Sequence, residues 1–342
     1  MKTSLKLLAF AAVPALCGCS HQTHQKNYAE LTSSDSTDMV FAVSDSIHAD
    51  SVTINEILEP MEWNFAEGCV IVNSPKNEEI FHVYAAPEFR YMYSFGKKGE
   101  GPGEFFSPNI YPSPDGKGFY ITDIAGKCCR YAIDQSHAWA VSETATRGYG
   151  ADMFVYAMTD DSTAVNRPGS GTRLEVVRFS QGLNVTDTIA SLQVEGPEKT
   201  ETYGDRTFTT RPSRNFPSVV SREGRVAFVY PQVRRIDYFD ITRDGKFSHV
   251  RSIGNLSCRR EIENSDIFSQ KRRDIEVRTT EKNIYVLDDN AIYVYDWNGN
   301  CMAELFPDKR ITSFIPDPVN SKIYGYDRRE DFEKVYVFDF TK

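Results

Sequence analysis

Acidic residues recur at the ends of predicted strands, where carboxylates from separate parts of the chain could meet. Asp123, Asp288 and Asp327 each end a short apolar run, and Asp289 extends the second of these positions. Carboxylates that converge on one point can hold a hard metal ion or act as general acid and base. Alternatively, each aspartate caps the turn after its own strand. Because these acids recur with a repeat, we favour turn capping and predict no metal site.

Arginine and aromatic residues gather in one long segment between predicted strands, Tyr203 to Phe216. A guanidinium group forms forked hydrogen bonds with anionic or sugar-like ligands, and aromatic rings supply stacking area. The alternative is a solvated surface with ordinary ion pairs. The sequence does not show that these arginines share one face. The candidate ligand-binding residues are Tyr203, Arg206, Arg211, Arg214, Arg234 and Arg235.

Recognisable catalytic motifs are absent from the sequence. The histidines of its main body lie outside HxH and HExxH patterns: His48, His82, His137 and His249. The Pro-Gly-Ser-Gly segment at residues 168–171 lacks the strand-to-helix context of a nucleophile elbow. We therefore predict no catalytic residues and no cofactor, and we keep an enzymatic activity as the second hypothesis.

The elements that must position these residues are short apolar runs separated by turns rich in Gly, Pro, Asn and Asp. A typical unit joins the runs Ile284–Asp288, Ala291–Asp296 and Cys301–Leu305. Its second turn contains Asn298-Gly299, which suits the positive φ values of a type I′ hairpin. Six such units are centred near residues 71, 121, 164, 227, 286 and 324.

Repeats of about 40 to 50 residues with several strands each are typical of propeller blades. We therefore predict an all-β fold, a six-bladed β-propeller over residues 39–342, with the aspartates at the mouth of its central channel. Strand-like runs at residues 39–43 and 52–58 have no blade of their own. We expect them to pair with the last unit and close the ring, which protects the sheet edges. A pair of β-sandwiches explains the repeat spacing less well.

The N-terminus has the features of a secretory signal. Lys2 and Lys6 precede an apolar run that is too short to span a bilayer. Its end, Leu16-Cys17-Gly18-Cys19, resembles a bacterial lipobox, which implies removal of residues 1–18 and acylation of Cys19. An ordinary signal with a chance cysteine is the alternative. The polar residues 19–38 are predicted to form a flexible tether.

Five further cysteines are distributed over the predicted strands and one loop: Cys69, Cys128, Cys129, Cys258 and Cys301. None has the CxxC spacing of a zinc site. Their odd number leaves at least one without an intramolecular partner. We predict free, buried thiols in preference to a disulfide framework.

A glycine-rich segment follows the second run of the first unit. Gly99, Gly101 and Gly103 permit backbone angles that other residues rarely adopt. We expect this segment to connect the first two blades, with Phe105 or Phe106 inserted in the core. A phosphate-binding loop is the alternative, but the segment lacks a Gly-Lys-Ser/Thr ending and a following helix.

The same segment, Ser94 to Phe105, resembles the Gly-x-x-Gly-x-Gly-Pro-Gly-Glu-Phe signature of six-bladed β-propeller lipoproteins. These are the NHL-like and TolB-like propellers of Gram-negative anaerobes. Residues 292–299 and 317–325 are similar to the last two blades of that group. The resemblance extends over about residues 60–340 and is weakest at 142–217. It implies a fold and a place in the cell envelope, but no activity.

The charge balance restricts the class of partner. The chain has 39 Lys and Arg against 48 Asp and Glu, a formal net charge of −9, which argues against nucleic-acid binding. We predict a monomeric, non-enzymatic binding or scaffolding module for a protein or glycan ligand, exported and held at the outer membrane by its lipid alone. The alternative is a propeller-type hydrolase or lyase that acts on an extracytoplasmic small molecule or glycan.

Overall fold

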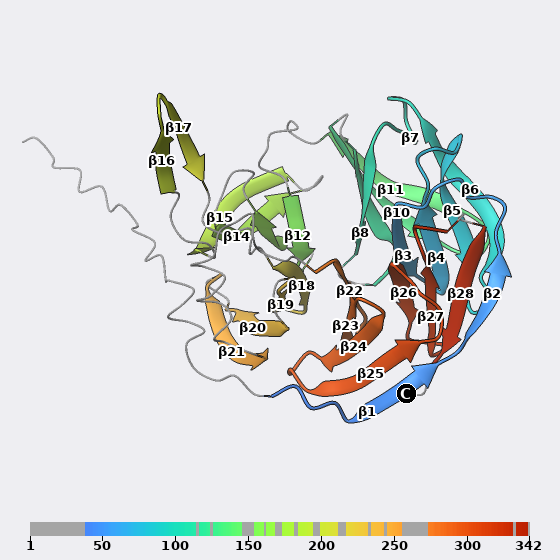
Figure 1. Ribbon diagram of the computed structural model, residues 1–342. Helices are drawn as coiled ribbons and strands as arrows, with labels where there is room; N and C mark the ends of the chain where they lie inside the picture. Colours follow the sequence, from blue (N-terminus) through green and yellow to red (C-terminus); the bar gives the residue numbers. More distant parts are fainter. Residues whose placement is uncertain are drawn as a thin grey trace, which may run out of the picture.

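The computed structural model describes residues 38–113, 116–123, 126–145, 154–160, 162–167, 173–180, 184–193, 199–210, 217–231, 234–242, 245–254, 273–330 and 333–340. Every regular element within these ranges is a β-strand. None of the described residues forms a helix with the length and apolar character needed to cross a membrane. Six sheets of four or five strands follow one another around a ring, with one separate two-stranded sheet (Figure 1). The predicted six-bladed β-propeller is confirmed.

The first three blades are antiparallel sheets whose strands follow one another in sequence order. Blade one contains β3 Glu62–Ala66, β4 Cys69–Asn73, β5 Glu79–Ala85, β6 Arg90–Lys98 and the short β7 Glu104–Phe105, which pairs parallel to β6. Blade two contains β8 Pro108–Pro112, β9 Phe119–Asp123, β10 Lys127–Ile133 and β11 Ala138–Ala145. Blade three contains β12 Phe154–Met158, β13 Thr163–Arg167, β14 Arg173–Ser180 and β15 Asn184–Gln193.

The last three blades repeat this order, and two of them also include a strand from the N-terminus. Blade four contains β18 Ser218–Arg222, β19 Arg225–Val229, β20 Arg235–Ile241 and β21 Phe247–Gly254. Blade five contains β22 Ile275–Thr279, β23 Asn283–Asp288, β24 Ala291–Asp296, β25 Cys301–Pro307 and β1 Val43–Ile47. Blade six contains β26 Ser313–Asp317, β27 Lys322–Tyr326, β28 Lys334–Asp339 and β2 Ala49–Thr53.

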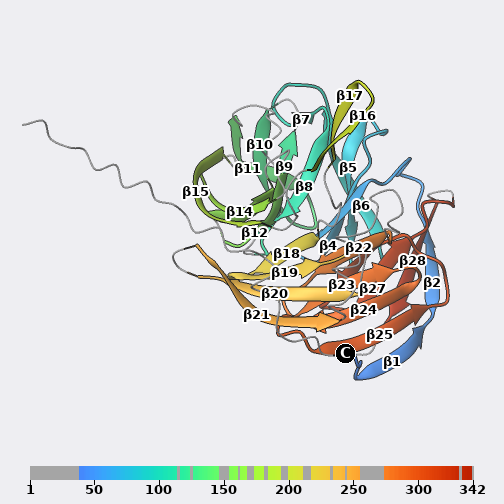
Figure 2. The same cartoon turned by 60° about the vertical axis from the view of Figure 1, so that its left-hand side comes forward.

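The N-terminal strands close the ring, as predicted, but only one of them joins the last blade. Strand β2 pairs antiparallel with β28 and completes the last blade, which confirms the expected closure. Strand β1 instead pairs parallel with β25 and extends blade five. Figures 1 and 2 both show these two strands beside the C-terminal blades. The prediction that both runs join the last unit was wrong, because the chain crosses the outer edge of blade five before it reaches blade six.

Buried apolar side chains fill all six interfaces between neighbouring blades. Phe228 and Phe239 of blade four pack with Val176 of blade three. Trp63 of blade one stacks on Tyr326 of blade six, with ring centroids 5.0 Å apart. Because this contact joins the first blade to the last, packing closes the ring as well as strand pairing does.

The sequence prediction missed the innermost strand of every blade except the third, where the predicted run at residues 153–158 coincides with β12. Strands β3, β8, β12, β18, β22 and β26 lie nearest the axis (Figure 1), and most contact the inner strand of a neighbouring blade. Their residues are more polar than those of the second strands. All five residues of β22 are half-buried, whereas all five of β4 are buried. The apolar runs that end near Asp123, Asp288 and Asp327 are therefore the second strands of their blades.

The glycine-rich segment is structural, as predicted. It links β6 to β7, and Phe105 is fully buried between blades one and two, whereas Phe106 is 69% exposed. Gly103 has a φ of 70°, and Gly99 has a φ of 150°. A Cβ atom at Gly99 would lie 2.1 Å from the carboxylate of Glu104. Any other residue here would strain the backbone at this φ and would displace the Glu104 side chain.

A buried lysine of blade two holds the glycine-rich segment in place. Lys127, at the start of β10, is 8% exposed. Its ammonium group donates hydrogen bonds to the carbonyl oxygens of Glu100, Gly101 and Glu104, at 3.2, 2.8 and 2.5 Å. It also lies 5.5 Å from the centroid of the Phe105 ring. These contacts connect blade one to blade two beyond the apolar core.

Candidate binding site at the mouth of the channel

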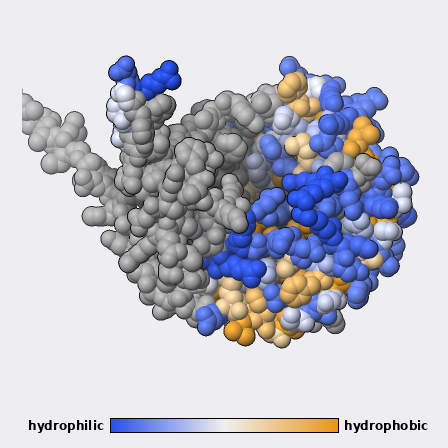
Figure 3. Space-filling view, viewed as in Figure 1, coloured by the Kyte–Doolittle hydropathy of each residue, from blue (hydrophilic) through white to orange (hydrophobic). Residues whose placement is uncertain are grey.

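A cavity of about 300 Å³ lies where the inner strands of four blades begin. We call it the central pocket. Its polar side chains come from blades one, five and six, and Ile110 of blade two contributes apolar surface. Figure 3 shows hydrophilic side chains gathered around the hollow at the middle of the ring. The polar residues that line the central pocket are Glu62, Asp274, Glu276, Arg278, Thr312 and Arg328.

A charged pair on β22 forms one wall of the pocket. Glu276 and Arg278 are two residues apart on the same strand, so their side chains project to the same side. They form an ion pair, and the Arg278 Nε–H donates to the carbonyl oxygen of Phe314 at 3.1 Å. The Ser313 hydroxyl lies 3.0 Å from Glu276 Oε1. The other carboxylate oxygen, Oε2, is buried and accepts no hydrogen bond from any described residue.

Glu62 of blade one lines the same pocket in a less polar setting. Its Oε2 accepts a hydrogen bond from the backbone N–H of Ile110 at 2.9 Å. Burial raises the pKa of the Glu62 carboxyl above its ordinary value, and the hydrogen bonds from Ile110 and Asn73 and the charge of Arg278 offset this effect only in part. The central pocket thus contains two glutamates in different electrostatic environments.

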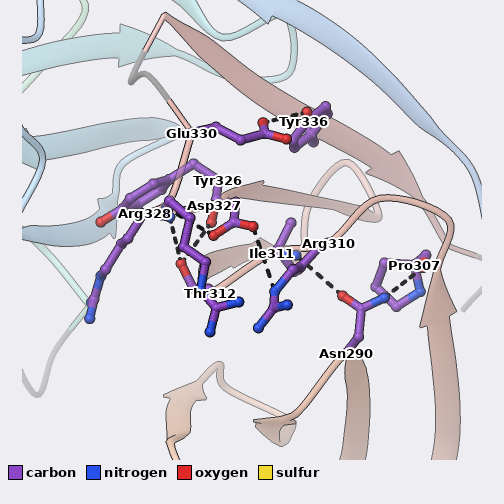
Figure 4. A network of polar contacts seen from close by, with 11 residues as sticks. Asn290, Pro307, Arg310, Ile311, Thr312, Tyr326, Asp327, Arg328, Glu330 and Tyr336 are labelled. Atoms are coloured by element: carbon purple, nitrogen blue, oxygen red, sulfur yellow. Dashed lines mark hydrogen bonds and ion pairs between the residues drawn. The ribbon is translucent and has the colours of Figure 1, made fainter.

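Arg328 follows β27 and lines the pocket from blade six. Its backbone N–H donates to the Thr312 hydroxyl at 2.7 Å. Burial lowers the pKa of the Arg328 guanidinium, but a hydrogen bond with Tyr326 and the charges of Glu276 and Asp274 outweigh it and raise the pKa. In Figure 4, the side chains of Arg328 and Arg310 both extend to the same side of the polar network, past Thr312.

The three predicted aspartates hold local contacts in separate blades. Asp123 Oδ2 accepts hydrogen bonds from the backbone N–H groups of Phe106 and Ser107, at 2.7 and 2.9 Å. Asp288 forms ion pairs with Arg273 and Arg234, and Asp327 lies 3.6 Å from Arg310.

Each of these aspartates ends or directly follows the second strand of its blade. Asp123, Asp288 and Asp327 each contact the segment that leads into their own blade: residues 106–107, Arg273 and Arg310, respectively. The carboxylates therefore recur with the repeat and anchor the connections between blades. No group of three or more His, Cys, Asp or Glu among the described residues is placed to hold a metal ion.

Two of the predicted arginines, Arg234 and Arg235, have different surroundings although they are adjacent in the sequence. Arg235 is 2% exposed and pairs with the buried Asp237 at 2.7 Å, within its own blade. Arg234 is exposed, lies 3.4 Å from Asp288, and has its guanidinium 4.6 Å from the centroid of the Tyr293 ring. The structure thus brings Arg234 and Asp288 together. It gives adjacent Arg235 a structural role.

The predicted Tyr203–Phe216 loop begins with a hairpin turn. Strands β16 Lys199–Tyr203 and β17 Arg206–Thr210 form the separate two-stranded sheet, which projects from the ring in Figure 1. Gly204-Asp205 is its two-residue turn, a signal that was readable in the sequence. Arg206 is exposed. Arg211 and Arg214 lie outside the described residues, as do Cys19, Cys258 and the whole N-terminal segment before residue 38.

The described histidines contact polar side chains, and His48 Nδ1 lies 3.1 Å from Asp308 Oδ2. His82 is buried, and its Nδ1 lies 2.8 Å from the Ser94 hydroxyl; burial lowers the pKa of this imidazole. His137 and His249 each contact a serine within three residues. The four described cysteines are free thiols, and three of them are buried.

Sequence reasoning missed the residues of the central pocket. Glu276 and Arg278 follow a segment without clear periodicity, and Glu62 begins a strand that was not recognised. Alternation of polar and apolar residues in Ile275-Glu276-Val277-Arg278-Thr279 was the available signal. A strand that borders a channel shows this pattern because its two faces differ in polarity.

Comparisons with known proteins give the fold a wider context. No protein-family model and no curated protein matches the chain. The β-propeller domain of Cps50 (Swd1) from Myceliophteria thermophila is similar over 86% of this chain and 100% of its own, with 8% identity and a TM-score of 0.47. Raptor from Chaetomium thermophilum is similar over 85% of this chain and 29% of its own, with 12% identity and a TM-score of 0.45. A functionally unknown protein from Desulfotomaculum acetoxidans matches over 71% of this chain and 70% of its own, with 12% identity and a TM-score of 0.35.

Proposed function

We propose that the protein is a lipid-anchored, monomeric binding module of the cell envelope. It captures a protein or glycan ligand at the central pocket and leaves the ligand chemically unchanged. A propeller supplies a rigid ring on which binding groups from several blades are held in fixed positions. Such a scaffold suits recognition, because little conformational freedom is lost when the ligand binds.

The central pocket is the observation that carries this proposal. Backbone contacts fix Glu62, Arg278 and the main chain at Arg328. Glu276 Oε2 is a buried acceptor without a donor, and the Trp63 Nε1–H is a buried donor without an acceptor. A buried polar atom without a partner costs about 1–3 kcal/mol, and a ligand that supplies the partner recovers this cost on binding.

A ligand screen with matched variants tests the proposal. The mature chain would be titrated with sets of peptides and oligosaccharides, and binding measured by calorimetry. Binding should weaken in Arg328→Gln and persist in Arg222→Gln, whose side chain pairs with Glu223 on the β18–β19 turn away from the pocket. Mass spectrometry should recover the ligand unchanged. Equal weakening in both variants would contradict a site at the central pocket.

The anchor is proposed from Cys19 and the segment before it. Acylation at this residue would place the ring outside the cytoplasm, at the outer membrane, on a tether of residues 19–38. A single chain holds a protein only marginally, whereas multiple acyl chains give a stable anchor. Mass spectrometry of the mature N-terminus tests this part independently of ligand binding.

A hydrolase or lyase is the second candidate function. It is favoured by the two glutamates of the central pocket, whose surroundings differ. Glu62 has a raised pKa, whereas Glu276 is paired with Arg278. Pairs of carboxylates in unlike environments serve as acid and base in many enzymes. If the wild type converts a bound glycan and Glu62→Gln does not, the enzymatic function is supported and the binding proposal is rejected.

A further inference from the structure

We infer that the central pocket takes a small zwitterion, with the ligand's carboxylate on Arg328 and its ammonium group on Glu276 and Asp274. This inference rests on the proposed binding function and names the chemistry of the ligand. The shared feature of the ligand class is one positive and one negative group a short distance apart. Free amino acids and short peptides both have it.

The positive side of the site is a guanidinium group that forms no ion pair with any residue the structure describes. Arg278 is occupied by Glu276 and by the carbonyl oxygen of Phe314. Arg328 has the Tyr326 hydroxyl as its side-chain partner, and no described carboxylate lies within 4.0 Å of its guanidinium. A free guanidinium in a pocket is suited to bind a carboxylate by two parallel hydrogen bonds.

The negative side consists of carboxylate oxygens that lack donors. Glu276 Oε1 is held by Arg278 and Ser313, and this fixes the direction of the buried, unpartnered Oε2. Asp274 is exposed at the rim and forms no ion pair with any residue that the structure describes. An ammonium group has three donors and satisfies both carboxylates at once.

The guanidinium of Arg328 and the carboxylates of Glu276 and Asp274 interact electrostatically but form no ion pair with each other. The charges of Glu276 and Asp274 help to raise the pKa of Arg328, so the three groups lie within electrostatic range. None of the described contacts closes an ion pair across the pocket. A ligand with both charges would bridge this separation and would gain from both sides.

Other ligand chemistries fit the pocket less well. A simple anion would meet the carboxylates of Glu62, Asp274 and Glu276, and a simple cation would meet Arg328. Sugars favour an open aromatic ring face, but Trp63 in this pocket is 3% exposed and stacks on Tyr326. A volume of about 300 Å³ is at the low end for ligand sites, which suits one or two amino-acid residues. Met61, which is 56% exposed, and Ile110 offer apolar contact to a ligand side chain.

Calorimetric titration of the mature chain tests the inference. One arm uses free amino acids with apolar side chains, and the other uses dipeptides and tripeptides of the same residues. Each ligand is compared with its N-acetylated form, which has no ammonium group, and its C-amidated form, which has no carboxylate. Neutral oligosaccharides form a third set. We expect the protein to bind the free amino acids, the short peptides or both. Its affinity for the N-acetylated and C-amidated forms should be at least tenfold lower than for the unmodified ligand.

Isosteric variants assign the two charges. Glu276→Gln should lower the affinity for the unmodified zwitterion at least tenfold, and the affinity for the N-acetylated form by less, because that form has no ammonium group. Arg328→Gln should likewise lower the affinity for the unmodified zwitterion at least tenfold, and the affinity for the C-amidated form by less, because that form has no carboxylate. Glu223→Gln and Arg222→Gln are the matched controls, because these residues pair with each other on the β18–β19 turn. Circular dichroism checks that each variant is folded. If one of the two pocket variants does not fold, the other still tests the inference.

Three results would overturn the inference, in different ways. If oligosaccharides bind at the pocket and zwitterions do not, the ligand class is wrong, while the binding function stands. If the folded wild type binds none of the three sets, both the zwitterion and the proposed binding function are rejected. Equal affinity for the modified and unmodified forms would also reject the zwitterion, because neither charge would then be recognised.

Discussion

Replacement of Lys127 by methionine probes the contact that joins the glycine-rich segment to blade two. The ammonium group donates to three carbonyl oxygens, of Glu100, Gly101 and Glu104, and its residue is only 8% exposed. Methionine has a similar length and retains apolar contact with the Phe105 ring. The substitution therefore removes the hydrogen bonds and the charge while leaving the volume of the side chain almost unchanged.

The expected loss of stability follows from these three bonds. A hydrogen bond to a charged group contributes about 1.5–3 kcal/mol, so three bonds give about 4.5 kcal/mol at the low end of that range. The three bonds share one ammonium group, so their contributions do not add in full. We expect a net loss of about 3 kcal/mol, equivalent to two such bonds at the low end of the range. With an unfolding entropy of about 2.1 cal/mol/K per residue, this lowers the Tm of a ring of this size by about 5 °C.

Thermal unfolding followed by circular dichroism measures this effect. Lys76→Met is the matched control, because the Lys76 side chain is 69% exposed and pairs only with Glu59 at the surface. A surface pair of this kind contributes about 0–1 kcal/mol, so the control should stay near the wild-type Tm. If Lys127→Met unfolds within 1 °C of the wild type, the ammonium group does not hold the segment, and the reasoning about the buried lysine is refuted.

Three further predictions address ring closure, pH and the anchor. Deletion of residues 39–58 removes β1, β2 and the buried Ile54, so the Tm should fall by more than about 5 °C; an unchanged Tm would contradict closure by these strands. Burial raises the folded-state pKa of Glu62 above 4.5, so its ionisation costs stability as the pH rises through that raised value. The Tm of Glu62→Gln should therefore lie closest to the wild-type value at acidic pH, where the carboxyl is protonated, and should exceed it once the pH has risen past the raised pKa; a pH-independent difference would refute this assignment. Cys19→Ala should move the protein from the membrane fraction to the soluble fraction of the envelope, and retention in the membrane would exclude the lipid anchor.

The second and third strands of each blade were predictable because they are buried on both faces. Strand β4, Cys69 to Asn73, is a continuous apolar run closed by one asparagine, and such a run stands out in any sequence. Strand β22 was missed because it alternates Glu276 and Arg278 with apolar residues next to the channel. The central pocket consists mainly of residues from these polar inner strands, and it was therefore missed with them.

The roles of single side chains depended on packing between blades that are distant in sequence. Lys127 has the appearance of an ordinary strand lysine, and its burial results from the segment at residues 100–104, which belongs to the preceding blade. The positions of Asp123, Asp288 and Asp327 were readable from the repeat. Their partners were not, because these are set by the connections between blades. Arg234 and Arg235 differ for the same reason, because Arg234 precedes β20 and pairs with Asp288 of blade five, whereas Arg235 begins β20 and pairs with Asp237 of its own blade.

The central claim is that the ligand binds in the pocket at the mouth of the channel. The most direct measurement is a crystal structure of the mature chain with the tightest ligand from the titrations. We predict ligand density between the Arg328 guanidinium and the Glu276 carboxylate, within hydrogen-bond distance of both. Density on the β16–β17 hairpin or elsewhere on the rim, with no ligand density in the central pocket, would contradict the account.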